Sequence, residues 1–381
     1  MRKYLLLLVI FVLAINFNGY AQTTDEGYKF TMVKQLPATS VKNQAATNTC
    51  YTFGTISMLE SELIRMGKGE YDLSEMQMVY NFYLGKAEKY IRMHGGTNFP
   101  EGGAADNTIN YLNRVGLVPE EVYNGINYGS ENHNHSELYP VLENYVQTIS
   151  NKGNKVSSMW KKGMEGILNA WLGTYPANFN YKGKSYTPQS FAKELGINPA
   201  DYVILTSFNH HPYYEKFVIE VPDNWESGSV YNVPLDEMEK IIDNAVNTGY
   251  TVTWSTDMGG GAAISSDGVY VVPEQDVTKM KREEYPALFK KPMAEKVVTQ
   301  EMRQKAFDVF QTTDDHAMHI TGIAKDQNGS KFYYVKNSWG VRGKYQGYIY
   351  CSAPFIRLQT TSILLNKAGI PKDIAEKLKI K

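Results

Sequence analysis

Apolar residues in the first part of the chain recur with the period of an α-helix. Between residues 53 and 66 they stand three or four positions apart, which predicts one buried face of an amphipathic helix: Phe53, Ile56, Leu59, Leu63 and Met66. Gly67 marks the predicted end of this helix. A stretch of small and polar residues, AATNT, directly precedes Cys50 and predicts a loop. We therefore expect Cys50 at the N-terminus of the helix or within one turn of it.

Two further helices are predicted in the same half of the chain. One covers residues 75–93, with Ser74 as its N-cap and Gln77 at the capping-box position three residues later. A glycine-rich loop, HGGTNFPEGGAA, follows at residues 94–105. The next helix covers residues 105–115 and ends at Gly116.

Short β-type segments dominate the last third of the chain. Turn residues separate the segments 316–326, 330–339 and 345–353, which predicts antiparallel strands joined by hairpins. Residues 202–221 also alternate as a strand does, and residues 22–40 are interpreted as a polar lead-in. A helical half followed by a strand-rich half is typical of an α+β protein with two lobes, and an active site between the lobes would draw on both halves.

The length of 381 residues would allow two to three domains, but two halves that share one site predict a single unit. We expect a helical lobe at about 40–120, a large insertion at about 121–250, a β-rich lobe at about 251–360 and a C-terminal helix at about 370–381.

Composition narrows the classes of function. The chain has 39 Lys and Arg and 40 Asp and Glu, a net charge of −1, so we expect no nucleic-acid partner. Its hydrophobic content of 43% is that of an ordinary globular protein. Two cysteines exclude a disulfide scaffold and a four-thiolate zinc or iron–sulfur site. They leave one disulfide, two inert thiols, or one reactive thiol beside an inert one.

The N-terminus has the features of a secretory signal peptide. Met1-Arg2-Lys3 is basic, residues 4–17 are apolar, and small residues end at Ala21. We expect cleavage after Ala21, export to the periplasm or the extracellular space, and no stable membrane insertion afterwards. An uncleaved anchor is the alternative, although these 14 apolar residues fall short of the roughly 20 that span a bilayer.

Cys50 is the residue that this pattern singles out for chemistry. The N–H groups and the dipole at a helix N-terminus favour a thiolate and lower the pKa of a thiol. Gln44, six residues upstream, would place an amide donor where it can bind an oxyanion together with the Cys50 N–H. A buried structural cysteine is the alternative for a lone thiol.

A thiol nucleophile needs a general base and acid, and the strand predicted from residue 316 supplies one. His316 opens that strand, and His319 is expected on its opposite face, so that only one of the two can face Cys50. Asn337 follows the next strand and could hold the imidazole in place, as the third member of a triad does. Trp339 would then cover that hydrogen bond from water.

This constellation resembles the papain-like cysteine proteases, and more closely their bleomycin hydrolase and bacterial aminopeptidase C branch. The motifs occur in the family's order over nearly the whole mature chain: Asn43-Gln44 with Cys50, Leu73-Ser74-Glu75, Gly102-Gly103, GLVP at 116–119, His316-Ala317-Met318, Asn337-Ser338-Trp339-Gly340, and GYIYCSAPF around Cys351.

The resemblance implies a papain-like, two-lobed α+β fold and a cysteine peptidase that acts on peptide substrates without a cofactor or metal. It implies these roles: Cys50 as nucleophile, His316 as general acid and base, Asn337 as orienting residue, Gln44 as oxyanion donor, and Gly102 and Gly103 as the backbone along which the peptide lies. Members of the branch often form ring-shaped hexamers, so the resemblance also offers a homo-hexamer as an oligomeric state.

Two departures from the family pattern change the expected activity. Tyr51 stands where the family carries Trp, and the loop before Cys50 is unusual. They motivate an alternative, a catalytically weak homologue that binds peptides without turnover. The family's C-terminal arm, which blocks one side of the cleft, has no counterpart after GIPKDIAEKLKIK. We therefore expect endopeptidase activity alongside or instead of aminopeptidase activity.

Other histidines and the second cysteine are weaker candidates for a metal site or a catalytic role. The pairs His133/His135 and His210/His211 lack the helical i, i+4 spacing with glutamate of a zinc protease, so we expect them in solvated loops or packed turns. Cys351 lies in a predicted strand and is expected to be a buried, inert thiol. A disulfide between Cys351 and Cys50 would inactivate the enzyme in an oxidising compartment.

Overall fold

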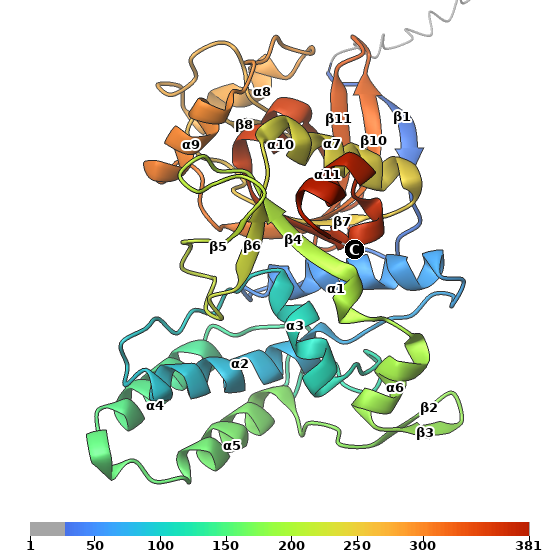
Figure 1. Ribbon diagram of the computed structural model, residues 1–381. Coiled ribbons are helices and arrows are strands. Elements are labelled where there is room, and N and C mark those ends of the chain that lie inside the picture. Colours follow the sequence, from blue (N-terminus) through green and yellow to red (C-terminus); the bar gives the residue numbers. More distant parts are fainter. Residues whose placement is uncertain (1–26, 381) are drawn as a thin grey trace, which may run out of the picture.

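The protein has two lobes that meet along one helix. The computed structural model describes residues 27–380, so the predicted signal segment lies outside the described residues. Helix α1 (Cys50–Arg65) runs between the lobes (Figure 1). The helical lobe contains α2 (Glu75–Arg92), α3 (Asp106–Val115), α4 (Leu138–Ser150), α5 (Trp160–Leu172), α6 (Pro188–Leu195) and a hairpin of β2 (Phe179–Tyr181) and β3 (Lys184–Tyr186).

An 11-stranded sheet forms the other lobe. Along the sheet the strands are β5 (Lys216–Val218), β6 (Ser229–Asn232), β4 (Tyr202–Thr206), β13 (Thr360–Asn366), β7 (Val252–Thr256), β10 (His316–Asp326), β11 (Lys331–Lys336), β12 (Tyr348–Ser352), β9 (Val269–Val271) and β8 (Ile264–Ser266), and β1 (Phe30–Gln35) pairs with β10. The predicted hairpins are confirmed, because β10, β11 and β12 pair antiparallel in chain order.

Helices of the second lobe pack around this sheet (Figure 1). They are α7 (Leu235–Thr248), α8 (Tyr285–Leu288), α9 (Gln300–Asp308), α10 (Ala353–Gln359) and α11 (Lys372–Lys377), with short 3₁₀ turns at Gly153–Lys155, Pro199–Asp201, Arg282–Glu284 and Lys367–Gly369. The apolar face of α7 shares one hydrophobic cluster with β7, β10 and β13, and a second cluster fills the helical lobe. No helix within residues 27–380 has the length and apolar character needed to cross a bilayer.

Helix α1 lies unusually close to strand β10. A Cβ atom added at Gly54 would stand only 3.2 Å from the carbonyl oxygen of Met318, tighter than most real contacts of this kind. Glycine in the interior of a helix weakens it relative to alanine, so its presence here is explained by this close approach. The first turn of α1 therefore lies beside the first residues of β10.

The predicted helix boundaries in the first half agree with the structure to within one residue for α3, whose C-cap is Gly116. Helix α2 begins as expected, because the Ser74 side chain accepts the Gln77 N–H. The capping box is half formed: the Ser74 N–H donates instead to the carbonyl of Val118 at 2.9 Å.

Some elements differ from the expectations. Residues 30–35, interpreted as polar lead-in, form β1, whose side chains alternate between partly buried and exposed. Segment 121–250, expected as one insertion, divides between the lobes: α4 to α6 join the helical lobe, and β4 to β6 with α7 join the sheet lobe. The strand-like stretch 202–221 is two strands, β4 and β5, separated by a loop.

Candidate active site

Cys50 is the first residue of α1, as predicted. The N–H groups of Thr52 and Phe53 donate to the Thr49 carbonyl, which starts the helix directly behind the thiol. No side chain caps this helix end, and within its first turn the backbone N–H of Tyr51 is directed to the thiol. The Cys50 side chain keeps partial exposure, and both Cys50 and Cys351 are free thiols.

His316 and Asn337 form the hydrogen bond expected of a catalytic pair. His316 Nε2 lies 2.8 Å from Asn337 Oδ1, and that oxygen also accepts the Ser338 N–H at 2.7 Å. Because an amide oxygen only accepts, His316 Nε2 carries the proton. In the neutral ring this leaves Nδ1 as the basic nitrogen. The Trp339 ring stacks on the imidazole, with centroids 4.7 Å apart, and covers the pair as predicted.

One cavity joins the two lobes at this point. Cys50 and Gly103 line it from the helical side, and His316 and Ala317 line it from the start of β10. His319 is directed elsewhere: its Nδ1 lies 2.9 Å from the Ser57 hydroxyl, about two turns along α1. Of the two histidines, only His316 lines the cavity with the thiol.

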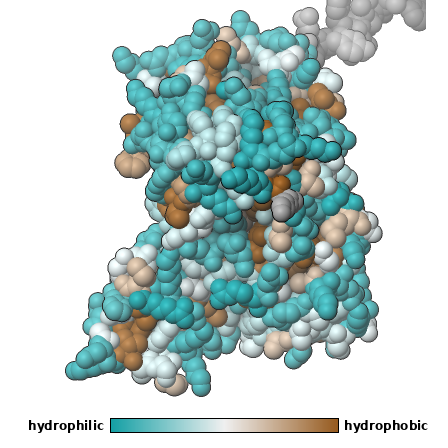
Figure 2. Space-filling model, in the orientation of Figure 1, coloured by the Kyte–Doolittle hydropathy of each residue, from teal (hydrophilic) through white to brown (hydrophobic). Residues whose placement is uncertain are grey.

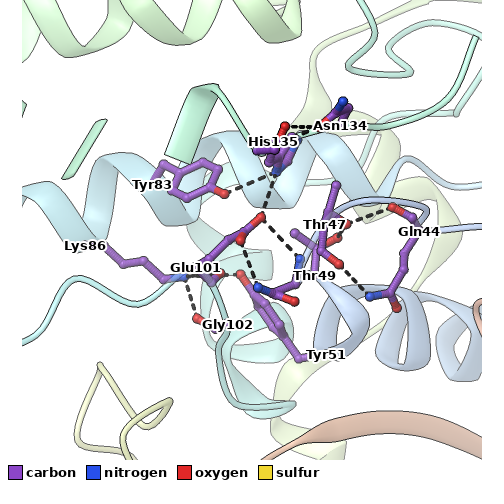
Figure 3. Close-up of polar contacts among 12 residues, drawn as sticks. Gln44, Thr47, Thr49, Tyr51, Tyr83, Lys86, Glu101, Gly102, Asn134 and His135 are labelled. Atoms are coloured by element: carbon purple, nitrogen blue, oxygen red, sulfur yellow. Dashed lines mark hydrogen bonds and ion pairs between the residues drawn. The ribbon is translucent and has the colours of Figure 1, made fainter. Parts of the chain in front are cut away.

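Gln44 connects the loop before Cys50 to the segment after Asn337. Its amide nitrogen donates to the Thr47 carbonyl at 2.7 Å (Figure 3). Its amide oxygen accepts the Ser338 hydroxyl at 2.6 Å. Its backbone N–H donates to the Ser338 carbonyl at 2.8 Å. Gln44 itself does not line the cavity. Because one of its amide N–H groups donates to Thr47, the predicted oxyanion role requires the other one.

The two predicted substrate-binding glycines lie on a loop held by a buried lysine. Lys86 Nζ donates to the carbonyl of Gly102 at 2.6 Å and to that of Glu101 at 3.0 Å (Figure 3). A Cβ at Gly103 would stand 2.8 Å from the ring of Tyr51. Packing of the protein itself therefore requires glycine at Gly103, in addition to any requirement of a substrate.

Glu101 ties this loop to its surroundings, a role that the sequence did not indicate. Its carboxylate accepts the backbone N–H of Asn48 at 3.2 Å and its side-chain amide at 2.9 Å. The other neighbour of the carboxylate is His135, whose Nδ1 lies 3.6 Å away and also 3.2 Å from the Tyr83 hydroxyl (Figure 3). The loop before the nucleophile and the glycine loop are thus fixed to each other.

Comparisons with known proteins place these features in a family. The model of the Peptidase C1-like family matches residues 96–381, which include His316 and Asn337. The chain belongs to the Peptidase C1-like family.

Among curated relatives, aminopeptidase G of Lactobacillus delbrueckii subsp. lactis is 23% identical, over 90% of this chain and 84% of the relative. Aminopeptidase C of the same organism is 21% identical, over 90% and 83%. The crystal structure of PepW from Lactobacillus rhamnosis superposes with a TM-score of 0.72 at 18% identity, covering 92% of this chain and 84% of that one. The expected papain-like α+β fold is confirmed, and the protein is a cysteine peptidase.

Tyr51, which stands where the family pattern has Trp, is packed into the hydrophobic core. Its side chain is 1% exposed, and its ring packs against Phe82 with centroids 5.6 Å apart. Lys86 Nζ lies 5.4 Å from the centre of the Tyr51 ring and 3.4 Å from its hydroxyl. The ring supports the glycine loop from below and leaves the chemical groups of the site unchanged.

The acidity of the Cys50 thiol differs from the expectation. Its pKa is raised to about 12, mainly by burial and in smaller part by the carboxylates of Asp223 and Asp315, whereas the backbone N–H groups of Ala317 and Tyr51 act in the opposite direction. Burial also lowers the pKa of His316, against the effect of its hydrogen bond to Asn337. Desolvation outweighs the backbone N–H groups at the Cys50 thiol, and in both groups it disfavours the charged form.

The remaining candidates lie outside this cavity. His210 Nε2 and His211 Nε2 lie 3.1 and 2.8 Å from the two oxygens of Glu220, and within residues 27–380 these three form the group with the spacing of metal ligands. His133 is buried in the helical lobe and has its pKa lowered to about 4, mainly by burial. Cys351 is fully buried in β12, as expected of an inert thiol.

Replacing Gly103 by alanine tests the packing of the glycine loop. The new methyl group meets the buried Tyr51 ring, so the loop has to shift from its position beside Cys50, and we expect kcat/KM on peptides to fall at least about tenfold. Gly166→Ala is the matched control, because Gly166 lies in α5 with no atom within 4 Å of the added Cβ. Equal activity of the two variants would contradict the role assigned to Gly103.

Proposed function

We propose that this peptidase hydrolyses peptide bonds with Cys50 as nucleophile, His316 as general base and acid, and Asn337 as the residue that orients His316. The observation that carries this proposal is the hydrogen bond between His316 and Asn337. It engages Nε2 of the imidazole and leaves Nδ1 as the basic nitrogen, and His316 lines the same cavity as Cys50. His316 and Asn337, which are 21 residues apart in the sequence, are thus in contact beside Cys50. Of the two cysteines in the described chain, Cys50 is partly exposed and Cys351 is buried.

The reaction begins with a proton transfer. His316 Nδ1 accepts the thiol proton as Cys50 sulfur attacks the peptide carbonyl, and the two charges that form stabilise each other. The Cys50 N–H and the free amide hydrogen of Gln44 donate to the oxyanion. His316 then protonates the leaving amine, and water hydrolyses the thioester with His316 again as base.

Covalent labelling tests the role of Cys50. In folded, reduced protein a peptidyl epoxide or chloromethyl ketone is expected to modify Cys50, and Cys50→Ala is expected to abolish both labelling and turnover. Cys351→Ala is the matched control, since Cys351 is fully buried and lies outside the cavity; labelling and turnover should persist in it. If Cys50 remains unmodified, the alternative of a peptide-binding homologue without turnover is favoured.

Cleavage of internal peptide bonds is part of the proposal. The last described residues, Lys379 and Ile380, line an adjoining cavity that shares Asp106, Ile204 and Gly228 with the cavity of Cys50. No described residue beyond Ser362 lines the cavity of Cys50 itself. This arrangement supports an open cleft on the side that receives the N-terminal part of a substrate.

A matched pair of peptides, one with a free and one with an acetylated N-terminus, tests endopeptidase activity. We expect both to be cleaved, the acetylated peptide more slowly, with Cys50→Ala inactive on each. Cleavage of the free peptide alone would contradict endopeptidase activity and leave an aminopeptidase.

Export completes the proposal, because residues 1–21 have the three regions of a signal peptide. Expression of the full chain in a Gram-negative host is expected to yield a periplasmic or secreted protein that begins at Gln22. N-terminal sequencing of the protein and cell fractionation check this. An intact N-terminus in the membrane fraction would instead identify an anchor.

A further inference from the structure

The cavity of Cys50 combines an apolar wall with carboxylates. Its apolar lining includes Ile204, Ile219, Val221 and Val230. Apart from His316, the charged residues that line it within the described chain are all acidic: Asp106, Asp223 and Asp314. A cavity of this kind favours a ligand that carries a positive charge next to an apolar group.

Asp223 is the carboxylate without a partner of its own. No hydrogen-bond donor within residues 27–380 contacts its side-chain oxygens, whereas its backbone N–H donates to Asp314 Oδ2 at 2.7 Å. The next residue is also fixed, because the Asn224 amide donates to the carbonyls of Ile219 and Gly228, each at 3.0 Å. The backbone around Asp223 is therefore held in place, and the carboxylate of Asp223 lines the cavity without a hydrogen-bond donor from the described residues.

The position of Asp223 relative to the glycine loop is equally specific. A Cβ atom added at Gly102 would fall 2.0 Å from Asp223 Oδ2, so the carboxylate lies directly against the Gly102 backbone. A peptide that extends from Cys50 along this loop meets the carboxylate of Asp223. The substrate either ends there or has to pass around it.

The nearest buried cation does not neutralise Asp223 by contact. Lys86 has three N–H donors, and they are directed to the carbonyls of Glu101 and Gly102 and to the hydroxyl of Tyr51. The pKa of Asp223 is raised to about 7, mainly by burial and also by the neighbouring carboxylate of Asp314, although the charge of Lys86 acts in the opposite direction. A cation brought by a ligand would stabilise the ionised form.

We propose that Asp223 binds the N-terminal ammonium group of the peptide substrate, with the first side chain packed against the apolar wall of the cavity. Asp223 is then a specificity-determining residue that favours free N-termini over internal bonds. This inference rests on the proposed function, because it assumes that Cys50 cleaves the peptide whose end Asp223 binds.

Three peptides of one sequence, with leucine as first residue, separate charge from size at the N-terminus. One carries the free amine, one has this amine replaced by hydrogen, and one is acetylated. For the wild type we expect kcat/KM on the free peptide to exceed that on the des-amino peptide by about tenfold to a hundredfold, the range of a hydrogen bond between charged groups. In Asp223→Asn that ratio is expected to fall to about one, through loss of activity on the free peptide alone.

Asp315→Asn is the matched control. Asp315 is a second carboxylate that acts on the Cys50 thiol, but it lies outside this cavity, so the preference for the free peptide is expected to persist. Labelling of Cys50 by a peptidyl epoxide shows that each variant is folded with an intact nucleophile. A wild-type ratio near one, or an unchanged ratio in Asp223→Asn, overturns the inference while the peptidase assignment stands. Absence of any Cys50-dependent cleavage in the wild type instead overturns the proposed function.

Discussion

The close packing of α1 on β10 is the constraint on which the site depends. Gly54 lets the helix approach the backbone at Met318, and the same contact sets Cys50, one turn earlier, beside Ala317 and His316. A side chain at this position would press on the backbone of Met318, and the α1 residues that follow are almost entirely buried, which leaves little room for the helix to move. Nucleophile and base come from distant parts of the sequence, and this contact brings them to one cavity.

A second set of contacts fixes the third member of the site. The loop before Cys50 and the segment after Asn337 are joined by backbone hydrogen bonds from Gln44 to Ser338 and from Gly340 to the carbonyl of Lys42, 2.8 and 3.0 Å long. A movement of Asn337 would therefore move the approach to the nucleophile as well. The face in Figure 2 is mostly hydrophilic.

Local signals were sufficient for the elements that carry the triad. The period of apolar residues placed Cys50 at a helix start, and turn residues between β-type segments placed His316 at the start of one strand and Asn337 directly after the next. Residues whose role depends on tertiary contacts left no such signal. Lys86 is one of many lysines until its burial beneath the glycine loop is known, and Asp223 lies 173 positions from Cys50 in a segment without a motif. The pKa of Cys50 was wrong in direction for the same reason, since burial depends on both lobes.

Burial connects specificity with catalysis in this cavity. The negative charge of Asp223 is one of the causes that hold the pKa of the Cys50 thiol high, because a thiolate would form near a carboxylate in a poorly solvated space. An ammonium group bound at Asp223 cancels that charge. The pKa of the thiol then falls, and proton transfer to His316 becomes easier when a substrate with a free N-terminus is in place. The carboxylate of Asp223 thus disfavours the thiolate only while the cavity is empty, so that binding of a substrate at the residue proposed to select it also removes an obstacle to the attack.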